Sequence, residues 1–197
     1  VTIEVVSAES AACYVSLAGT HEPPFSSWLT AATNIQAAID VAIPGATVWV
    51  TNGTYSTGGM AGYPAGSQLT NRVTLYKPVT VRSVNGPELT VIEGMKPNGS
   101  TAVRCVYMSD KASLIGFTIT NGATRTEDDY NERGAAGGIW SESTQSIVSN
   151  CIISGNTAVY HGGGVFFGTF YDCTLTGNNS ASSGGGARYA TLQHCII

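Results

Sequence analysis

The densest charge in the sequence lies between residues 125 and 133. The charged side chains there are Arg125, Glu127, Asp128, Asp129, Glu132 and Arg133. The four carboxylates, Glu127, Asp128, Asp129 and Glu132, can gather a hard cation such as Ca²⁺, although their spacing does not match the helix–loop calcium motif. Together with an arginine they can instead line a saccharide cleft, which makes Arg125, Asp128 and Asp129 candidate catalytic residues. The alternative is a solvated loop without a ligand.

A second candidate site is a column of side chains that follow glycine runs. Trp140, Phe166 and Arg188 each come one residue after an apolar position, and alternation along a strand predicts that they point outward. Two rings and a guanidinium group one repeat apart would form a flat surface for stacking sugars, at about 0.5–1.5 kcal/mol per aromatic contact. The alternative is that a loop or a partner chain covers them.

A third candidate is the pair Asp172 and His194, which lie one repeat apart and directly before a cysteine. A carboxylate beside an imidazole can orient the ring for general-base catalysis. No nucleophile or third group is evident, so the alternative is a surface contact without catalysis. His161 is interpreted as a turn residue.

A 22-residue repeat positions these residues. Residues 151–156 (CIISGN) return at 173–178 (CTLTGN) and begin again at 195, and a glycine triplet at 162 returns at 184. A period in the range of about 20–50 residues is typical of solenoids, in which each repeat buries its apolar face against its neighbours. Residues 117–120 resemble 151–154, but the spacing between these two segments exceeds one repeat. The extra residues are assigned to loops within 123–136 and 141–147.

The repeat predicts columns that point inward. Cys151, Cys173 and Cys195 form one such column, and stacked buried thiols are expected there, although a disulfide between neighbouring coils is geometrically possible. Asn156 and Asn178 are expected to stack and to hydrogen-bond in a turn. The glycine triplets are expected to supply tight turns or positive φ. These columns are structural, and none is assigned a catalytic role.

The remaining elements fit one all-β domain over residues 1–197. Residues 1–20 predict one or two strands, and 33–43 predict a helix with Thr33 as N-cap and a stop at Pro44-Gly45. Coils of short strands are expected over 47–197, beginning with a strand at 47–50. The last coil is incomplete, so a fragment of a longer chain is expected.

Composition excludes several classes of function. The net charge is −4, without a cluster of lysine and arginine, which argues against nucleic acid or an anionic membrane as a partner. No run of 18 apolar residues is present, so no membrane span is expected.

The sequence resembles right-handed, single-stranded parallel β-helix proteins of the pectin-lyase-like superfamily. The resemblance begins with residues 28–39 (WLTAATNIQAAI), continues through 44–50 (PGATVWV) and 52–55 (NGTY), and departs from the family at Ala46, where Asp is usual. It implies that the helix caps the N-terminal end of the coils. The 22-residue repeats look like those of bacterial surface proteins, including the chlamydial polymorphic outer-membrane proteins, which implies a secreted or cell-surface location.

Two functions are expected from different classes. The first is an extracellular or cell-surface scaffold that binds glycans or adheres through its turns and aromatic column. The second is a carbohydrate-active enzyme, either a polysaccharide lyase or another hydrolase, for which Ca²⁺ is a possible cofactor. Self-association through the open C-terminal coil is also expected, because unpaired strand edges invite pairing.

Overall fold

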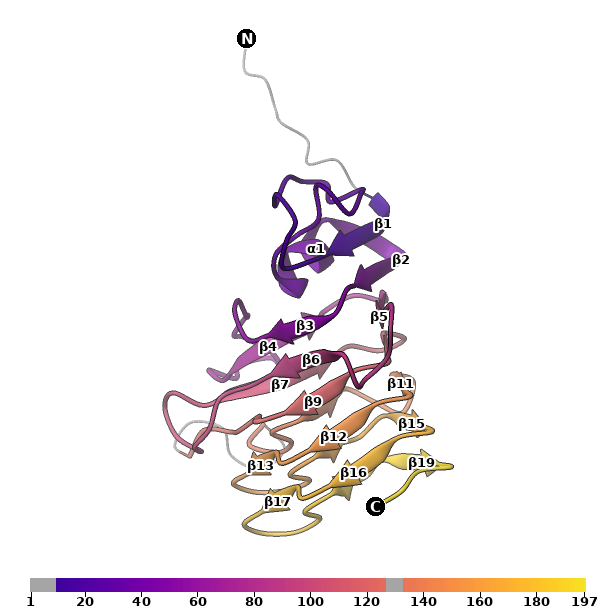
Figure 1. Cartoon of the computed structure of the whole chain (residues 1–197). Helices are drawn as coiled ribbons and strands as arrows, with labels where there is room; N and C mark the ends of the chain where they lie inside the picture. Colours follow the sequence, from indigo (N-terminus) through magenta and orange to yellow (C-terminus); the bar gives the residue numbers. More distant parts are fainter. Residues whose placement is uncertain (1–9, 127–132) are drawn as a thin grey trace.

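The computed structural model describes residues 10–126 and 133–197, and it consists of parallel strands stacked in sheets. Figure 1 shows the strands following one another from α1 and β1 at one end of the stack to β17 and β19 at the other. From β2 onward, successive strands belong to different sheets, and each strand pairs in parallel with its equivalent in the next coil. We call one strand from each of sheets A, B and C, taken in chain order, a coil. This arrangement is consistent with a parallel β-helix.

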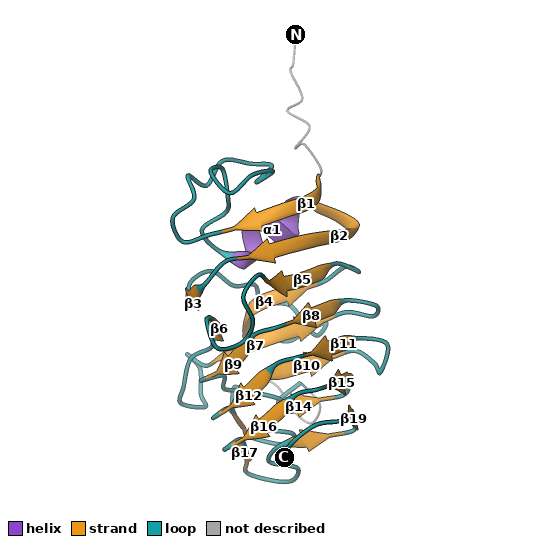
Figure 2. Cartoon of the chain, turned by 45° about the vertical axis from the view of Figure 1, so that its right-hand side comes forward, coloured by secondary structure: helices purple, strands orange, loops and turns teal. Residues whose placement is uncertain are grey.

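Three sheets run along the stack, and a fourth is small (Figure 2). Sheet A contains β1 Ser10–Val15, β2 Ala42–Val50, β5 Thr80–Ser83, β8 Ser113–Ile115, β11 Ile147–Ser149, β15 Thr169–Tyr171 and β19 Thr191–Gln193. Sheet B contains β3 Gly53–Tyr55, β6 Thr90–Glu93, β9 Thr118–Thr120, β12 Ile152–Ser154 and β16 Thr174–Thr176. Sheet C contains β4 Thr70–Leu75, β7 Val103–Met108, β10 Ile139–Ser141, β14 Val165–Phe166 and β18 Ala187–Arg188. Sheet D contains β13 Thr157–Ala158 and β17 Asn179–Ser180.

The register confirms the repeat. Phe170 pairs with Leu192 and Val165 with Ala187, and each pair joins equivalent positions of consecutive repeats. The longer spacing in the preceding coil is confirmed as well, because Thr118 pairs with Ile152. The extra residues therefore lie in connections between strands rather than in the strands themselves.

The inward columns form one apolar core. Cys151, Cys173, Ile153 and Leu175 are at most 2% exposed and belong to a cluster that also includes Val15 near the start of the described chain. All five cysteines lie in the described residues, and none is bridged. Burial raises the pKa of the Cys105 thiol to about 12, so this thiol stays protonated at neutral pH.

The asparagine ladder is also present. The Asn156 side chain is 1% exposed and donates from Nδ2 to Asn178 Oδ1 at 3.0 Å. Its Oδ1 accepts from the Gly122 N–H at 2.8 Å, so the amide joins three consecutive coils. The Asn156 amide, which is buried at this turn, thus has a partner for both its donor and its acceptor, as a buried amide requires.

The glycine triplets do more than permit positive φ. Gly162 has φ 56°, as expected, but Gly163 is not in the left-handed region. A Cβ on Gly163 would lie 2.0 Å from the Asn179 carbonyl oxygen, so the next coil leaves no room for a side chain. Close approach of two coils, not turn geometry, explains this glycine.

The N-terminal elements differ in detail from those expected. Helix α1 covers Ile35–Val41, shorter than 33–43, and its N-cap is Asn34 rather than Thr33, with Asn34 Oδ1 accepting from the Ala37 N–H at 2.9 Å. The helix ends at Val41, and the chain is extended from Ala42 onward, so it leaves the helix before it reaches Pro44-Gly45. At the N-terminal end, β1 covers Ser10–Val15, and the part of the predicted strands in residues 1–9 lies outside the described residues.

Helix α1 also closes the first edge of sheet C. The Gln36 side chain is buried; its Nε2 donates to the Thr74 carbonyl at 3.3 Å and its Oε1 accepts from the Thr74 N–H at 2.7 Å. Thr74 lies on β4, the outermost strand at that edge. The amide therefore satisfies a peptide group that would otherwise be an unpaired edge.

In the described residues, no helix is long and apolar enough to cross a membrane.

Candidate functional site

The aromatic column predicted from the sequence lies on the outer face of sheet C. Trp140 pairs with Phe166 and Phe166 with Arg188 on successive strands, as the repeat indicated. The ring centroids of Trp140 and Phe166 are 6.1 Å apart, and Tyr107 stacks on Trp140 at 5.4 Å. The rings thus continue one another from coil to coil.

The predicted exposure of this column is wrong. Trp140 is 8% exposed and Phe166 is fully buried, so neither ring is available for stacking on a sugar. Ala135 and Ala136 pack over the rings as part of the same apolar cluster, with Tyr63 and Phe167 at its border. Only Arg188, on β18, remains half-buried within the column. A covering loop, the alternative considered above, is what the structure contains.

A buried arginine holds this covering segment in place. Arg104 on β7 donates to the carbonyl groups of Arg133, Ala135 and Ala136 at 2.5–2.9 Å. Its remaining nitrogen, Nη1, donates to Asn71 Oδ1 at 3.0 Å. Arg104 is not among the residues predicted from the sequence, although a lone arginine between apolar strand residues is a usable signal for a buried hydrogen-bonding role.

The next residue in each repeat carries a ring that is less covered, partly buried at Phe167 and exposed at Tyr189. Phe167 and Tyr189 follow β14 and β18, and their rings stack with centroids 5.5 Å apart and an interplanar angle of 29°. Tyr189 is 57% exposed, and Phe166 lies beneath both rings in edge contacts of 4.7 and 5.7 Å. We call Phe167 and Tyr189 the aromatic platform.

The platform depends on an unusual backbone. Phe167 and Tyr189 both have φ 54°, in the left-handed region that bulky side chains rarely adopt. Strain of this kind persists only where the surrounding structure enforces it, and it concentrates at ligand-binding and active sites. Strand alternation could not find these residues, because a left-handed residue breaks the alternation on which that inference depends.

Polar groups border the platform. Arg188 Nη1 lies 3.1 Å from His161 Nδ1 and also donates to Ser183 Oγ, while Nη2 donates to the Tyr189 hydroxyl at 3.0 Å. The Arg188 guanidinium carbon is 4.7 Å from the Tyr189 ring centroid, a cation–π distance. His161, interpreted from the sequence as a turn residue, is therefore part of a polar cluster with side chains from two coils.

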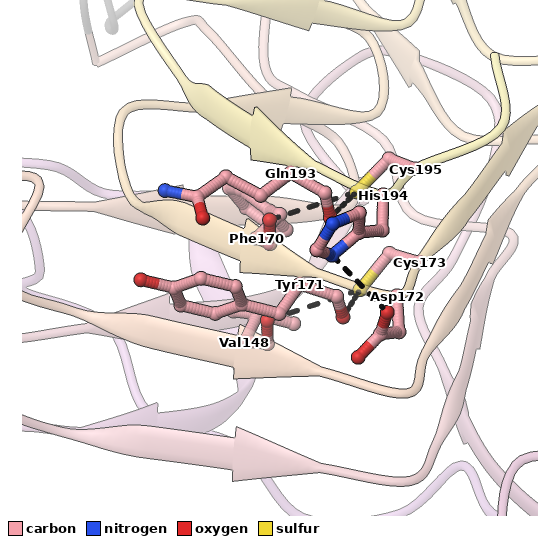
Figure 3. Close-up of polar contacts among 8 residues, drawn as sticks. All are labelled: Val148, Phe170, Tyr171, Asp172, Cys173, Gln193, His194 and Cys195. Carbon is pink, nitrogen blue, oxygen red and sulfur yellow. Dashed lines mark hydrogen bonds and ion pairs between the residues drawn. The ribbon is translucent and has the colours of Figure 1, made fainter.

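The predicted proximity of Asp172 and His194 is confirmed. The Asp172 carboxylate and His194 Nδ1 are 3.7 Å apart, and the two side chains are 70% and 83% exposed (Figure 3). Among the described residues, no third side chain bonds to either group. Both residues have positive φ, as do Asn150 and Gly116 at the equivalent position of earlier coils. The turn between sheets A and B requires a left-handed residue at this position in each of these coils. Gly, Asn, Asp and His tolerate the left-handed region, which accounts for the residue types found there.

Most of the acidic segment lies outside the described residues. This applies to Glu127, Asp128, Asp129 and Glu132, the candidate metal ligands. Arg125 is described, and its Nη1 donates to the Ser100 carbonyl at 3.0 Å. In residues 10–126 and 133–197, no group of three or more His, Cys, Asp or Glu side chains is arranged to hold a metal ion.

A hollow of about 430 Å³ lies near sheet D, at the turn that follows the strands of sheet B. It is lined by Lys96, Pro97, Asn98, Asn156, Thr157, Gly177 and Asn179. Asn98 donates to Thr157 Oγ1 at 3.3 Å and accepts from the Thr124 N–H at 3.0 Å, so it ties the loop to the coils. Lys96 is the charged residue in this lining, and it is exposed.

No protein-family model, no curated protein and no solved structure matches this chain.

Proposed function

We propose that this chain is an extracellular or cell-surface β-helix scaffold that binds glycans through the aromatic platform. The observation that carries the proposal is the pair of rings, Phe167 and Tyr189, stacked one coil apart in a strained backbone. Aromatic faces pack against the C–H faces of sugars, and the hydroxyl and guanidinium groups of Tyr189 and Arg188 lie within reach of a bound sugar.

The proposal includes the finer fold assignment. We place the chain with right-handed parallel β-helices of the pectin-lyase-like type, which include large bacterial surface proteins. Support comes from parallel pairing in every major sheet and from the helix at the N-terminal end. Crossovers between parallel strands of one sheet are right-handed in about 98% of cases.

The first test is a glycan array followed by calorimetry with the ligands found. Phe167→Ala and Tyr189→Ala should each weaken binding about two- to tenfold, since an aromatic contact is worth about 0.5–1.5 kcal/mol. Tyr171→Ala is the matched control, because Tyr171 lies on β15 on the outer side of sheet A. Lys96→Gln tests the hollow near sheet D as a competing site.

Two results would remove the proposal. One is an array without any binding by the wild-type chain. The other is a loss of binding in Lys96→Gln that the two platform variants do not share.

A carbohydrate-active enzyme, either a polysaccharide lyase or another hydrolase, is the second candidate. It is favoured by one observation, the 3.7 Å approach of Asp172 and His194. A turnover screen on acidic and neutral polysaccharides, with and without EDTA, tests it. Activity that His194→Ala abolishes would support this candidate, and a silent screen would leave the scaffold.

A further inference from the structure

The positive charge of Arg188 has only neutral hydrogen-bond partners among the described residues. They are the imidazole of His161 and the hydroxyl groups of Ser183 and Tyr189. No carboxylate in the described part of the chain pairs with this half-buried guanidinium group. The Nε atom is buried and makes no hydrogen bond. A cation partly withdrawn from water is stabilised most strongly by an anion, and Arg188 has no anionic partner among the described residues.

The hydrogen-bond directions leave donors for a ligand. Both hydroxyl groups accept a hydrogen bond from Arg188, so their own hydrogens point elsewhere. Nδ1 of His161 accepts from Arg188 Nη1 and so carries no hydrogen, which makes the Ser183 hydroxyl the donor in its 3.1 Å contact with that nitrogen; a ligand oxygen at Ser183 would take the place of this contact. Nη2 carries two hydrogens, of which the Tyr189 hydroxyl takes one. The second Nη2 hydrogen and the Tyr189 hydroxyl are therefore open to a ligand, with the Ser183 hydroxyl beside them, and donors grouped around a guanidinium charge recognise an oxyanion.

The donors lie beside the aromatic platform rather than apart from it. Tyr189 contributes its ring to the platform and its hydroxyl to the donor set, and the ring lies 4.7 Å from the guanidinium carbon. Ser183 is exposed, and an isolated parallel β-bridge joins it to His161 in the preceding coil. A sugar on the rings would thus carry its substituents towards Arg188.

We propose that Arg188, Ser183 and Tyr189 bind an oxyanion substituent, a carboxylate or a sulfate, of the glycan that stacks on the platform. This inference rests on the proposed function and narrows its ligand to acidic glycans. Arg188 supplies the charge, the two hydroxyl groups supply direction, and the rings hold the sugar.

The experiment uses short oligosaccharides with one backbone in three charge states: dextran, carboxymethyl-dextran and dextran sulfate. Calorimetry at physiological ionic strength should show that the charged forms bind at least about tenfold more tightly than dextran, because charge-assisted hydrogen bonds are roughly twice as strong as neutral ones. A preference confined to one charged form identifies the substituent.

Two variants separate the oxyanion from the stacking. Tyr189→Phe keeps the ring and removes one donor, so it should weaken the charged forms and leave dextran unchanged. Arg188→Gln should bring the charged forms to the level of dextran. The matched control is Arg82→Gln, which removes the same charge from an exposed arginine that lies 5.6 Å from the Trp49 ring.

The outcomes distinguish this inference from the proposed function. Equal binding of all three oligosaccharides would overturn the oxyanion site and leave the glycan scaffold. If Arg188→Gln weakens binding of the charged forms but Phe167→Ala has no effect, the oxyanion site is supported and the platform is contradicted. Equal losses in Arg188→Gln and Arg82→Gln would indicate unspecific attraction and overturn the inference.

Discussion

Aromatic rings lie along the outer side of sheet C in two regions that differ in what covers them. In the covered region, Tyr107 and Trp140 are buried beneath Ala135 and Ala136, whose carbonyl groups Arg104 binds. In the open region, Phe167 and Tyr189 continue the contacts between rings, but Tyr189 is 57% exposed. The strand pattern is similar in both. The difference teaches that an insertion between strands, not the strand itself, decides whether such rings form a core or a surface.

The largest expected effect concerns the anchor of the covered region. Arg104→Met should lower the free energy of unfolding by about 3–5 kcal/mol, because several buried carbonyl groups lose their donor. Urea denaturation measures this loss. In a background of Trp28→Phe and Trp49→Phe, fluorescence quenching should show Trp140 becoming accessible. Arg82→Met is the exposed control, and an equal, small loss in both variants would contradict the role of Arg104.

The next effect concerns the turn that carries the platform. Gly168→Ala should cost about 2–3 kcal/mol, since Gly168 has φ 87° and a Cβ there would lie 2.9 Å from Ser141 Oγ. Its equivalent one coil later is Ala190, which is not in the left-handed region. Ala190→Gly is therefore the control and should change stability by less than about 1 kcal/mol. Thermal unfolding of both variants checks the difference.

The two regions should also separate in binding. Trp140→Phe should leave glycan affinity within about twofold of wild type, because the covered ring offers no face to a sugar and phenylalanine still packs against Phe166. Phe167→Ala should weaken the same binding about two- to tenfold. Calorimetry on both variants with one ligand checks this. Equal losses would show that the covered ring takes part in the site.

A smaller effect should appear only at high pH. Burial, reinforced by the hydrogen bond to Glu142, raises the pKa of Tyr107 above its ordinary value of 10.0. A raised folded-state pKa means that the unfolded chain ionises first, so this residue lowers the free energy of unfolding as the pH rises above about 10. Stability should fall less steeply above about pH 10 in Tyr107→Phe than in wild type. Identical slopes in urea titrations would argue against this protonated, buried state.

The smallest effect is expected at the exposed pair. Asp172→Asn should change the free energy of unfolding by less than about 0.5 kcal/mol, because solvated ion pairs contribute little. Denaturation at low and at high salt checks this value. A loss above about 1 kcal/mol would mean that the pair has a role that exposure does not suggest.

The repeat by itself determined the inward columns, the register and the stacked asparagines. A column such as Cys151 and Cys173 can be predicted because the neighbouring coil presents the same residue at the same height. The placement of Asp172 beside His194 followed from the same spacing. Periodicity carries this information because each coil packs mainly against its two neighbours.

The tertiary structure decided which side chains reach solvent. Trp140 is buried under a segment that Arg104, distant from it in sequence, binds through its carbonyl groups, whereas Tyr189 is 57% exposed. The platform also depends on positive φ at Phe167 and Tyr189, which strand alternation does not encode. Contacts between segments that are not neighbours in the repeat, together with local backbone strain, set these features, and the period of the repeat carries no information about either.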